Sequence, residues 1–186
     1  MLGSPHARLA AADDLDALTA AALEARAAEG VASNADTPGK IARHMRAALT
    51  DPGLIPLVVD ADDETIAGFA LLRPLLPSAL YDLPRLHVEA IYVAKPFRRR
   101  GFGRALLCGA VEHAERIDAP DVTVLALTGS RSVQRFCARL GFTQVASHRV
   151  IDTTTLAERL GRVPADRSSL ERLITLRRRQ RTVPQT

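Results

Sequence analysis

Apolar positions along this chain switch between runs with a strand period and stripes with a helical period. The strand-like runs are short and rich in aliphatic residues, and they predict strands at 7–10, 54–59, 65–73, 86–93, 122–127 and 142–151. Between these runs, apolar residues recur every three or four positions, as on one face of a helix. Strands and helices that interchange in this way indicate a domain of the α/β or α+β class.

Several predicted elements carry recognisable end signals. Thr37-Pro38 combines an N-cap with a proline at the first helical position. Gly141 suits the left-handed residue that commonly ends a helix. Gly68 interrupts a predicted strand, which indicates a bulge or a close approach of another backbone.

The chain changes character after its last predicted strand. Capping-box patterns at 155–158 and 168–171 predict two short helices, and an arginine-rich stretch follows at 177–181. Arginines near a helix C-terminus complement the helix dipole, and no aromatic residues lie between them as in a nucleic-acid-binding segment. We therefore expect one domain over residues 1–152 and a basic, helical extension over 153–186.

The stretch 86–107 contains the strongest chemical signal. Three arginines, Arg98–Arg100, run directly into Gly101-Phe102-Gly103 at the predicted start of a helix. The first turn of a helix leaves backbone N–H groups without internal acceptors, and the dipole adds positive charge there. The two glycines allow a ligand to approach the backbone closely. The stretch therefore predicts a site for phosphate or pyrophosphate.

Composition limits the class of protein. With 186 residues, of which 47% are hydrophobic, the chain can form one domain with a substantial core and is not of the disordered class. The net charge of +4 suits anionic ligands, including nucleic acid, and does not decide between them. Two cysteines are too few for a disulfide scaffold, so we expect reduced, packed thiols in a cytoplasmic protein. Neither a signal peptide nor a membrane span is visible.

Three landmarks occur in the order found in one known family. They are a strand that leads to a proline, a basic turn of the pattern Arg-x-x-Gly-x-Gly, and a later helix that ends in Gly-Phe: 93–96, 98–103 and 135–142. Together they resemble the GNAT superfamily of acetyl-CoA-dependent N-acetyltransferases, over roughly residues 8–149. The resemblance implies a mixed, mostly antiparallel sheet of six to seven strands flanked by helices. It also implies acetyl-CoA as co-substrate and an amine as acceptor.

The same resemblance implies which residues bind the co-substrate. Backbone groups of Ile91 and Val93 would bond the pantetheine arm, and the Val93 N–H would donate to the thioester oxygen. Ser130 stands where the family often has asparagine. The implied cofactor-binding residues are Ile91, Tyr92, Val93, Arg98, Arg99, Arg100, Gly101, Phe102, Gly103, Arg104, Ser130 and Phe136.

His87 and Glu89 are the candidate catalytic residues. They are two apart on a predicted strand, so strict alternation places them on one face, and both are costly to bury in an apolar run without a purpose. Enzymes of the resembled family draw their general base from these positions. We expect Glu89 to be the base and His87 to be accessory. Either could instead hold a cationic substrate, and His87 could simply be a hydrogen-bonded histidine of the sheet.

The proton donor and the acceptor wall are less defined. Cys137 occupies the position where the family often has an acidic tyrosine, and a small packed residue is favoured there over a proton donor. Solvent or Tyr81 could take that role. The resemblance puts the acceptor beside the first two helices, so four polar residues there could touch it: Asn34, Asp36, Arg43 and His44. No metal is expected, because the acidic turn 60–64 lacks the glycine and distal glutamate of a calcium loop.

Three functions compete at this point. The first is an N-acetyltransferase, an acyltransferase for groups other than aminoacyl, whose acceptor amine on a small molecule or a protein attacks directly in a ternary complex. The second is a non-catalytic domain that binds or senses acyl-CoA. The third, a nucleic-acid-binding protein, rests only on charge and the arginine-rich end. The expected partners are acetyl-CoA and an amine, without membrane or nucleic acid, and a homodimer is left open.

Overall fold

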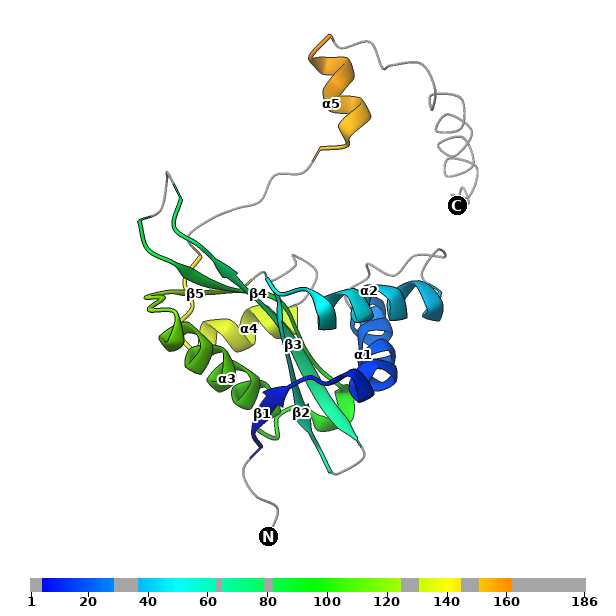
Figure 1. The fold of residues 1–186 in the computed structure, drawn as a ribbon, viewed down its shortest axis with the longest axis vertical. Helices are drawn as coiled ribbons and strands as arrows, with labels where there is room; N and C mark the ends of the chain where they lie inside the picture. The colour runs from blue at the N-terminus through cyan, green and yellow to red at the C-terminus, as the bar shows by residue number, and fades with distance from the viewer. Residues whose placement is uncertain are drawn as a thin grey trace. The chain divides into compact units, whose positions relative to one another are not determined.

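Five strands form one sheet in the order β1-β2-β3-β4-β5 in the computed structural model (Figure 1). They are β1 (Ala7–Leu9), β2 (Ile55–Asp60), β3 (Ile66–Leu75), β4 (Arg85–Val93) and β5 (Val122–Val124). The first four pair antiparallel, and β4 pairs with β5 in parallel. The structure describes residues 5–28, 37–62, 65–78, 82–124, 131–144 and 151–161.

The predicted α+β class and the mostly antiparallel sheet are confirmed. The described part of the chain contains five strands, against the six to seven predicted. Of the predicted last strand, residues 142–144 and 151 are not in a strand, and 145–150 lie outside the described residues. Only the first three residues of the predicted strand 122–127 are described.

Helices cover both faces of the sheet (Figure 1). On one face lie α1 (Leu15–Ala28) and α2 (Pro38–Thr50), and on the other lie α3 (Phe102–Arg116) and α4 (Arg131–Arg139). The predicted cap of α2 is confirmed, because the Thr37 Oγ1 accepts the Lys40 N–H at 3.3 Å. The predicted end of α4 is also confirmed, since Gly141 has a φ of 86°.

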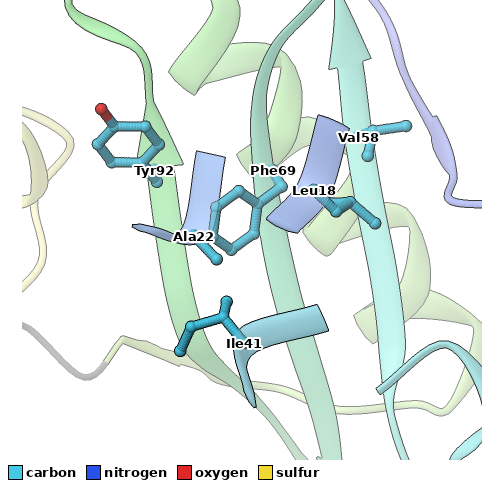
Figure 2. Packing of buried hydrophobic residues seen from close by; sticks show 6 residues of the cluster. All are labelled: Leu18, Ala22, Ile41, Val58, Phe69 and Tyr92. Atoms are coloured by element: carbon cyan, nitrogen blue, oxygen red, sulfur yellow. The ribbon is translucent and has the colours of Figure 1, made fainter. Parts of the chain in front are cut away.

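The core between the sheet and the first two helices is an apolar cluster centred on Phe69 (Figure 2). Its members are Leu18 and Ala22 of α1, Ile41 of α2, Val58 of β2, Phe69 of β3 and Tyr92 of β4. A fully buried side chain of this size contributes about 1.5–3 kcal/mol. The cluster therefore holds α1 and α2 against β3 and β4, the two strands beside which the candidate site lies.

The backbone of β4 lies close to Gly68 of β3, as the sequence predicts. It is opposite Val93 in the sheet, and the pairing of β3 with β2 is irregular next to it. A Cβ at this position would lie 2.3 Å from the carbonyl oxygen of Tyr92. The absence of a side chain thus sets the distance between the strands beside the candidate site.

Replacing Gly68 by alanine is expected to destabilise the fold by about 1–3 kcal/mol, the usual range for overpacking. The added Cβ would meet backbone atoms of β4, which cannot rotate away as a side chain can. Urea unfolding measures the change. Gly39→Ala on α2 is the matched control, because its Cβ would have nothing within 4 Å. Equal stability of the two variants would contradict the close approach.

The chain divides into two compact units, Met1–Gly141 and Phe142–Thr186. The described helix of the second unit is α5 (Thr153–Arg159). Asp152 caps it, because the Asp152 Oδ1 accepts the N–H of Thr154 at 2.9 Å and of Thr155 at 3.2 Å. The N-cap is therefore Asp152, three residues before the predicted cap Thr155. An aspartate offers a stronger cap than threonine, and this competition decided the boundary.

Other expectations for the second unit stay predictions. The second short helix at 168–171 and the arginine-rich stretch 177–181 lie outside the described residues. The domain boundary that the sequence places after Asp152 also stays a prediction. Among the described helices, none has the length and apolar character needed to cross a membrane.

Candidate functional site

The turn between β4 and α3 has the backbone of an anion-binding site. Arg99 and Gly101 both have positive φ, 62° and 92°. The first helical hydrogen bond of α3 runs from the Ala105 N–H to the Gly101 carbonyl oxygen at 3.0 Å. Helix geometry therefore leaves the N–H groups of Phe102, Gly103 and Arg104 without an acceptor inside the helix. Left-handed turn residues ahead of a helix N-terminus form a concavity that fits a phosphate group.

Four arginines lie in this turn or in the first helical turn after it, and two of them hold its shape. Arg98 Nε donates to the Val93 carbonyl oxygen at 2.9 Å, and its guanidinium carbon lies 5.7 Å from the Tyr92 ring centre. Arg100 lies over the rings of Phe97 and Phe102, at 5.9 and 5.7 Å. Arg99 and Arg104 are exposed, and neither has a hydrogen-bond or ion-pair partner among the described residues.

The start of α3 also contacts α4. A Cβ on Gly103 would lie 3.4 Å from Phe136 Cζ and 3.7 Å from Val93 Cγ2. Phe136, which the family resemblance names as a cofactor-binding residue, therefore lies beside the turn. Ser130, the predicted residue at the start of α4, lies outside the described residues.

Glu89 occupies a β-bulge in β4. Leu71 of β3 is opposite Ala90, while the next residue, Leu72, is opposite Val88, so Glu89 has no partner on β3. Residues directly opposite in an antiparallel pair share a face. His87 is opposite Arg73 and therefore shares its face, and beyond the bulge that face continues through Ala90 and Tyr92. Strict alternation would have continued it through Ile91 and Val93 instead.

Arg73 binds the Glu89 carboxylate at this bulge. Its Nε donates to Glu89 Oε1, and its two terminal nitrogens each lie 3.4 Å from Asp51 Oδ2 in the turn after α2. One of them also lies 3.3 Å from the Gly53 carbonyl oxygen. These contacts, first of all the hydrogen bond to Glu89, raise the pKa of Arg73. The guanidinium thus stays charged and joins β3, the bulge and the end of α2.

His87 turns toward the opposite neighbour. Its Nδ1 lies 2.9 Å from Thr123 Oγ1 on β5, whereas the Glu89 carboxylate contacts Arg73 on β3. The two candidate catalytic side chains therefore have different partners. The predicted alternation on one face therefore does not bring both of them to one point.

A cavity of about 230 Å³ lies between β4 and the first two helices. Its polar lining is Glu89 and Tyr92 of β4, His44 of α2 and Arg26 of α1, and His87 is not among the lining residues. The rest of the lining is apolar: Ala22, Ala25, Ile41, Met45, Phe69, Leu71, Ala90, Ile91 and Val133. Val133 comes from α4, so the cavity is bounded by helices from both faces of the sheet.

The expected acceptor residues are only partly brought together. Of those named from the sequence, His44 lines the cavity, Arg43 is exposed and does not, and Asn34 and Asp36 lie outside the described residues. Sequence reasoning missed Arg26 and Arg73. For Arg73 a signal existed, because a single arginine interrupts the apolar strand Ile66–Leu75, as Glu89 interrupts β4.

Tyr92 connects the site to α1. Its hydroxyl donates to Glu24 Oε2 at 3.1 Å and points away from the apolar cluster (Figure 2). Burial, followed by this contact with a carboxylate, raises the pKa of Tyr92. The phenol is therefore protonated at neutral pH and fastens β4 to the helix that forms one wall of the cavity.

The two cysteines differ. Cys137 is buried in α4, and burial raises the pKa of its thiol, which agrees with the predicted packing role. Cys108 is exposed on α3, so the expectation that both thiols are packed was wrong. Tyr81, the other candidate proton donor, lies outside the described residues. No group of three potential ligands that could hold a metal ion occurs in the described ranges.

Known proteins share this architecture. Solved structures with a similar fold include a ribosomal-protein-alanine N-acetyltransferase from Brucella melitensis biovar Abortus 2308, with a TM-score of 0.66 and 17% identity over 81% of this chain and 99% of that one. Another is a predicted acetyltransferase with acetyl-CoA from Clostridium acetobutylicum, with a TM-score of 0.65 and 16% identity over 81% and 97% of the two chains. Likeness at these identities defines the fold.

Sequence comparison defines the family. Residues 20–142 match the model of the acetyltransferase (GNAT) family, and the chain therefore belongs to that family. The predicted family, that of the GNAT N-acetyltransferases, is confirmed, and acetyl-CoA is the co-substrate typical of this family. An L-ornithine N5-acetyltransferase from Arabidopsis thaliana is 29% identical over 80 residues, which are 43% of this chain and 35% of that protein. The match thus spans about a third of the relative's length.

Proposed function

We propose that this protein transfers the acetyl group of acetyl-CoA to a primary amine that enters the cavity beside β4. The observation that carries this proposal is the position of Glu89. Its bulge puts a carboxylate into an otherwise mostly apolar cavity, on the strand that leads directly into the Arg98–Gly103 turn. An acid–base group and a phosphate-binding turn thus belong to one continuous segment.

The turn is proposed to bind the phosphates of acetyl-CoA. The N–H groups at the start of α3 donate to the phosphate oxygens, and Arg99 and Arg104 add positive charge from exposed positions. Arg98 and Arg100 keep the turn in shape through their contacts with Val93 and the aromatic rings. Backbone groups of Ile91 and Val93 are proposed to bond the pantetheine arm, with the Val93 N–H as donor to the carbonyl oxygen.

The cavity is proposed to receive the acceptor. Its volume of about 230 Å³ suits a small amine or the end of a side chain. Acetyl-CoA supplies an activated acyl group, and the amine must be neutral to attack it. We assign removal of the ammonium proton to Glu89, through one water, in a ternary complex. His87 is at most accessory, because its ring contacts Thr123 and does not line the cavity.

Turnover with a panel of primary amines tests this function. The protein is incubated with acetyl-CoA and each amine in turn, release of the coenzyme A thiol is followed over time, and the product is identified by the mass of one added acetyl group. We expect turnover with at least one small or lysine-like amine. Saturable acetyl-CoA binding without turnover on any amine would instead favour the non-catalytic, acyl-CoA-sensing alternative.

Replacing Cys137 by alanine is expected to leave kcat within about tenfold of the wild type, well short of the loss of an acid–base group. The thiol is buried in α4, and its raised pKa reflects that burial rather than a partner that would move a proton. Steady-state kinetics on the active amine measure the effect, with a thermal melt as the folding control. A loss beyond about 100-fold in a folded variant would make Cys137 the proton donor.

A further inference from the structure

The bulge raises the question of what orients the Glu89 side chain. In the register of the sheet, no residue of β3 lies opposite Glu89, so the hydrogen-bond ladder does not hold its backbone as it holds the flanking residues. In the described part of the chain, the hydrogen bond that its carboxylate accepts comes from Arg73 and uses Oε1. That contact leaves Oε2 as the oxygen available to a ligand in the cavity.

Arg73 is suited to this task by its geometry. Guanidinium presents its donors in a rigid fork, and here Nε reaches the bulge while the terminal nitrogens reach Asp51 and the Gly53 carbonyl. Asp51 is itself held in the turn after α2, where its Oδ1 accepts the Gly53 N–H at 2.8 Å. Arg73 is thus held at its terminal nitrogens by the turn after α2 as well as at Nε by Glu89.

An ion pair of this exposure contributes little to stability. The side chains of Arg73 and Glu89 are 35% and 34% exposed, and pairs this accessible to water are weak in measured cycles. A purely stabilising role therefore gives no reason why an arginine of β3 contacts both β4 and the turn after α2. A role in fixing the direction of one carboxylate gives such a reason.

The charge of Arg73 also acts on an incoming amine. If a protonated acceptor lies beside Glu89, its ammonium group is close to the Arg73 guanidinium on the other side of the carboxylate. Both groups are positive, so they repel each other. This repulsion disfavours a long-lived ammonium–carboxylate pair in the cavity. The cation is therefore held less strongly at Glu89 than it would be without Arg73.

We propose that Arg73 is a positioning residue for acetyl transfer, which holds the Glu89 carboxylate at the bulge with one oxygen left for the acceptor. The inference rests on the base role proposed for Glu89. Arg73 acts through Glu89 and does not itself line the cavity. Its loss should consequently change kcat and leave the affinity for acetyl-CoA unchanged.

The test compares Arg73→Gln, Arg73→Lys, Glu89→Gln and the double variant Arg73→Gln/Glu89→Gln. We expect Arg73→Gln to lower kcat by about ten- to a hundredfold, as misplacement of a catalytic group by about 1 Å can do. The KM for acetyl-CoA should stay within about twofold of the wild-type value, since the proposed contacts that bind acetyl-CoA lie at the Arg98–Gly103 turn. Arg73→Lys should recover part of kcat, because it restores the charge without the fork. In the Glu89→Gln background the Arg73 change should have little further effect.

Arg85→Gln is the matched control. Arg85 lies on β4, has a similarly exposed side chain (34%), and contacts Asp121 at 3.6 Å instead of Glu89. It should keep wild-type kcat. If Arg73→Gln does not fold, Asp51→Asn serves in its place, since it loosens only the far side of the contact and should lower kcat less.

Each outcome decides between the claims. Wild-type kcat in a folded Arg73→Gln, or equal losses in the two Glu89 backgrounds, would overturn the positioning role while leaving the base in place. Full activity of Glu89→Gln would overturn the proposed base, and the inference with it. Loss of kcat in Arg85→Gln as large as in Arg73→Gln would show that any charge removed from this region has the same effect.

Discussion

A single negative charge at Gly101 is expected to abolish the thermal stabilisation that acetyl-CoA gives to this protein. Gly101 has a φ of 92° and precedes the N–H groups at the start of α3. An aspartate there would put a carboxylate where the phosphates are proposed to bind, and the two anions would repel. A ligand at about 100 times its Kd stabilises the folded state by about 2.7 kcal/mol, which is the shift to be lost.

Asparagine at the same position separates charge from backbone strain. Asn and Asp are both tolerated in the left-handed region better than other residues with a Cβ, and they have nearly the same shape. We expect Gly101→Asn to bind acetyl-CoA more weakly than the wild type but measurably, and Gly101→Asp not to bind. Melting temperatures across an acetyl-CoA titration give the comparison. Equal binding by the two folded variants would mean that the phosphates bind elsewhere.

Replacing Glu89 by glutamine is expected to lower kcat/KM at neutral pH at least tenfold, with part of the loss recovered at high pH. An acceptor amine with a pKa of about 10.4 is almost entirely protonated at pH 7. Glutamine keeps the shape of the side chain but cannot take the proton. As pH rises, free amine accumulates and the need for a base falls, so the variant should approach the wild type.

The pH–rate profile also tests His87. Because His87 contacts Thr123 and Glu89 contacts Arg73, we expect His87→Ala to have the smaller effect. The two losses should add, as they do for residues without a shared partner. A strongly non-additive double variant would instead indicate one water held by both. Near-wild-type profiles for both single variants would move the base to another residue, or show that the amine arrives neutral.

The sequence by itself determined the features that depend only on residues close to one another in the chain. The positive φ of Gly141, the Thr37 cap of α2 and the close approach at Gly68 were all predicted, because each follows from the conformational or steric properties of one residue in its local context. The turn proposed to bind phosphate is local in the same sense, since a short segment contains all of its N–H donors.

Tertiary structure alone decided which catalytic candidate reaches the cavity. Alternation along β4 treats His87 and Glu89 alike, and nothing in the strand itself announces a bulge. The bulge exists only in the register with β3, and one extra residue exchanges the faces of everything beyond it. For the same reason Ala90 and Tyr92, rather than Ile91 and Val93, share the face of His87.

The surroundings of Glu89, its partner Arg73 and the polar residues near them, were likewise beyond the sequence. Arg73 and Asp51 are 16 and 38 positions away along the chain, and Arg26 and His44 come from two further helices. A lone charge in an apolar strand marks a residue that needs a partner, but the identity of the partner depends on how strands and helices pack. Here that packing joins the carboxylate of β4 to the guanidinium of β3 and to the turn after α2.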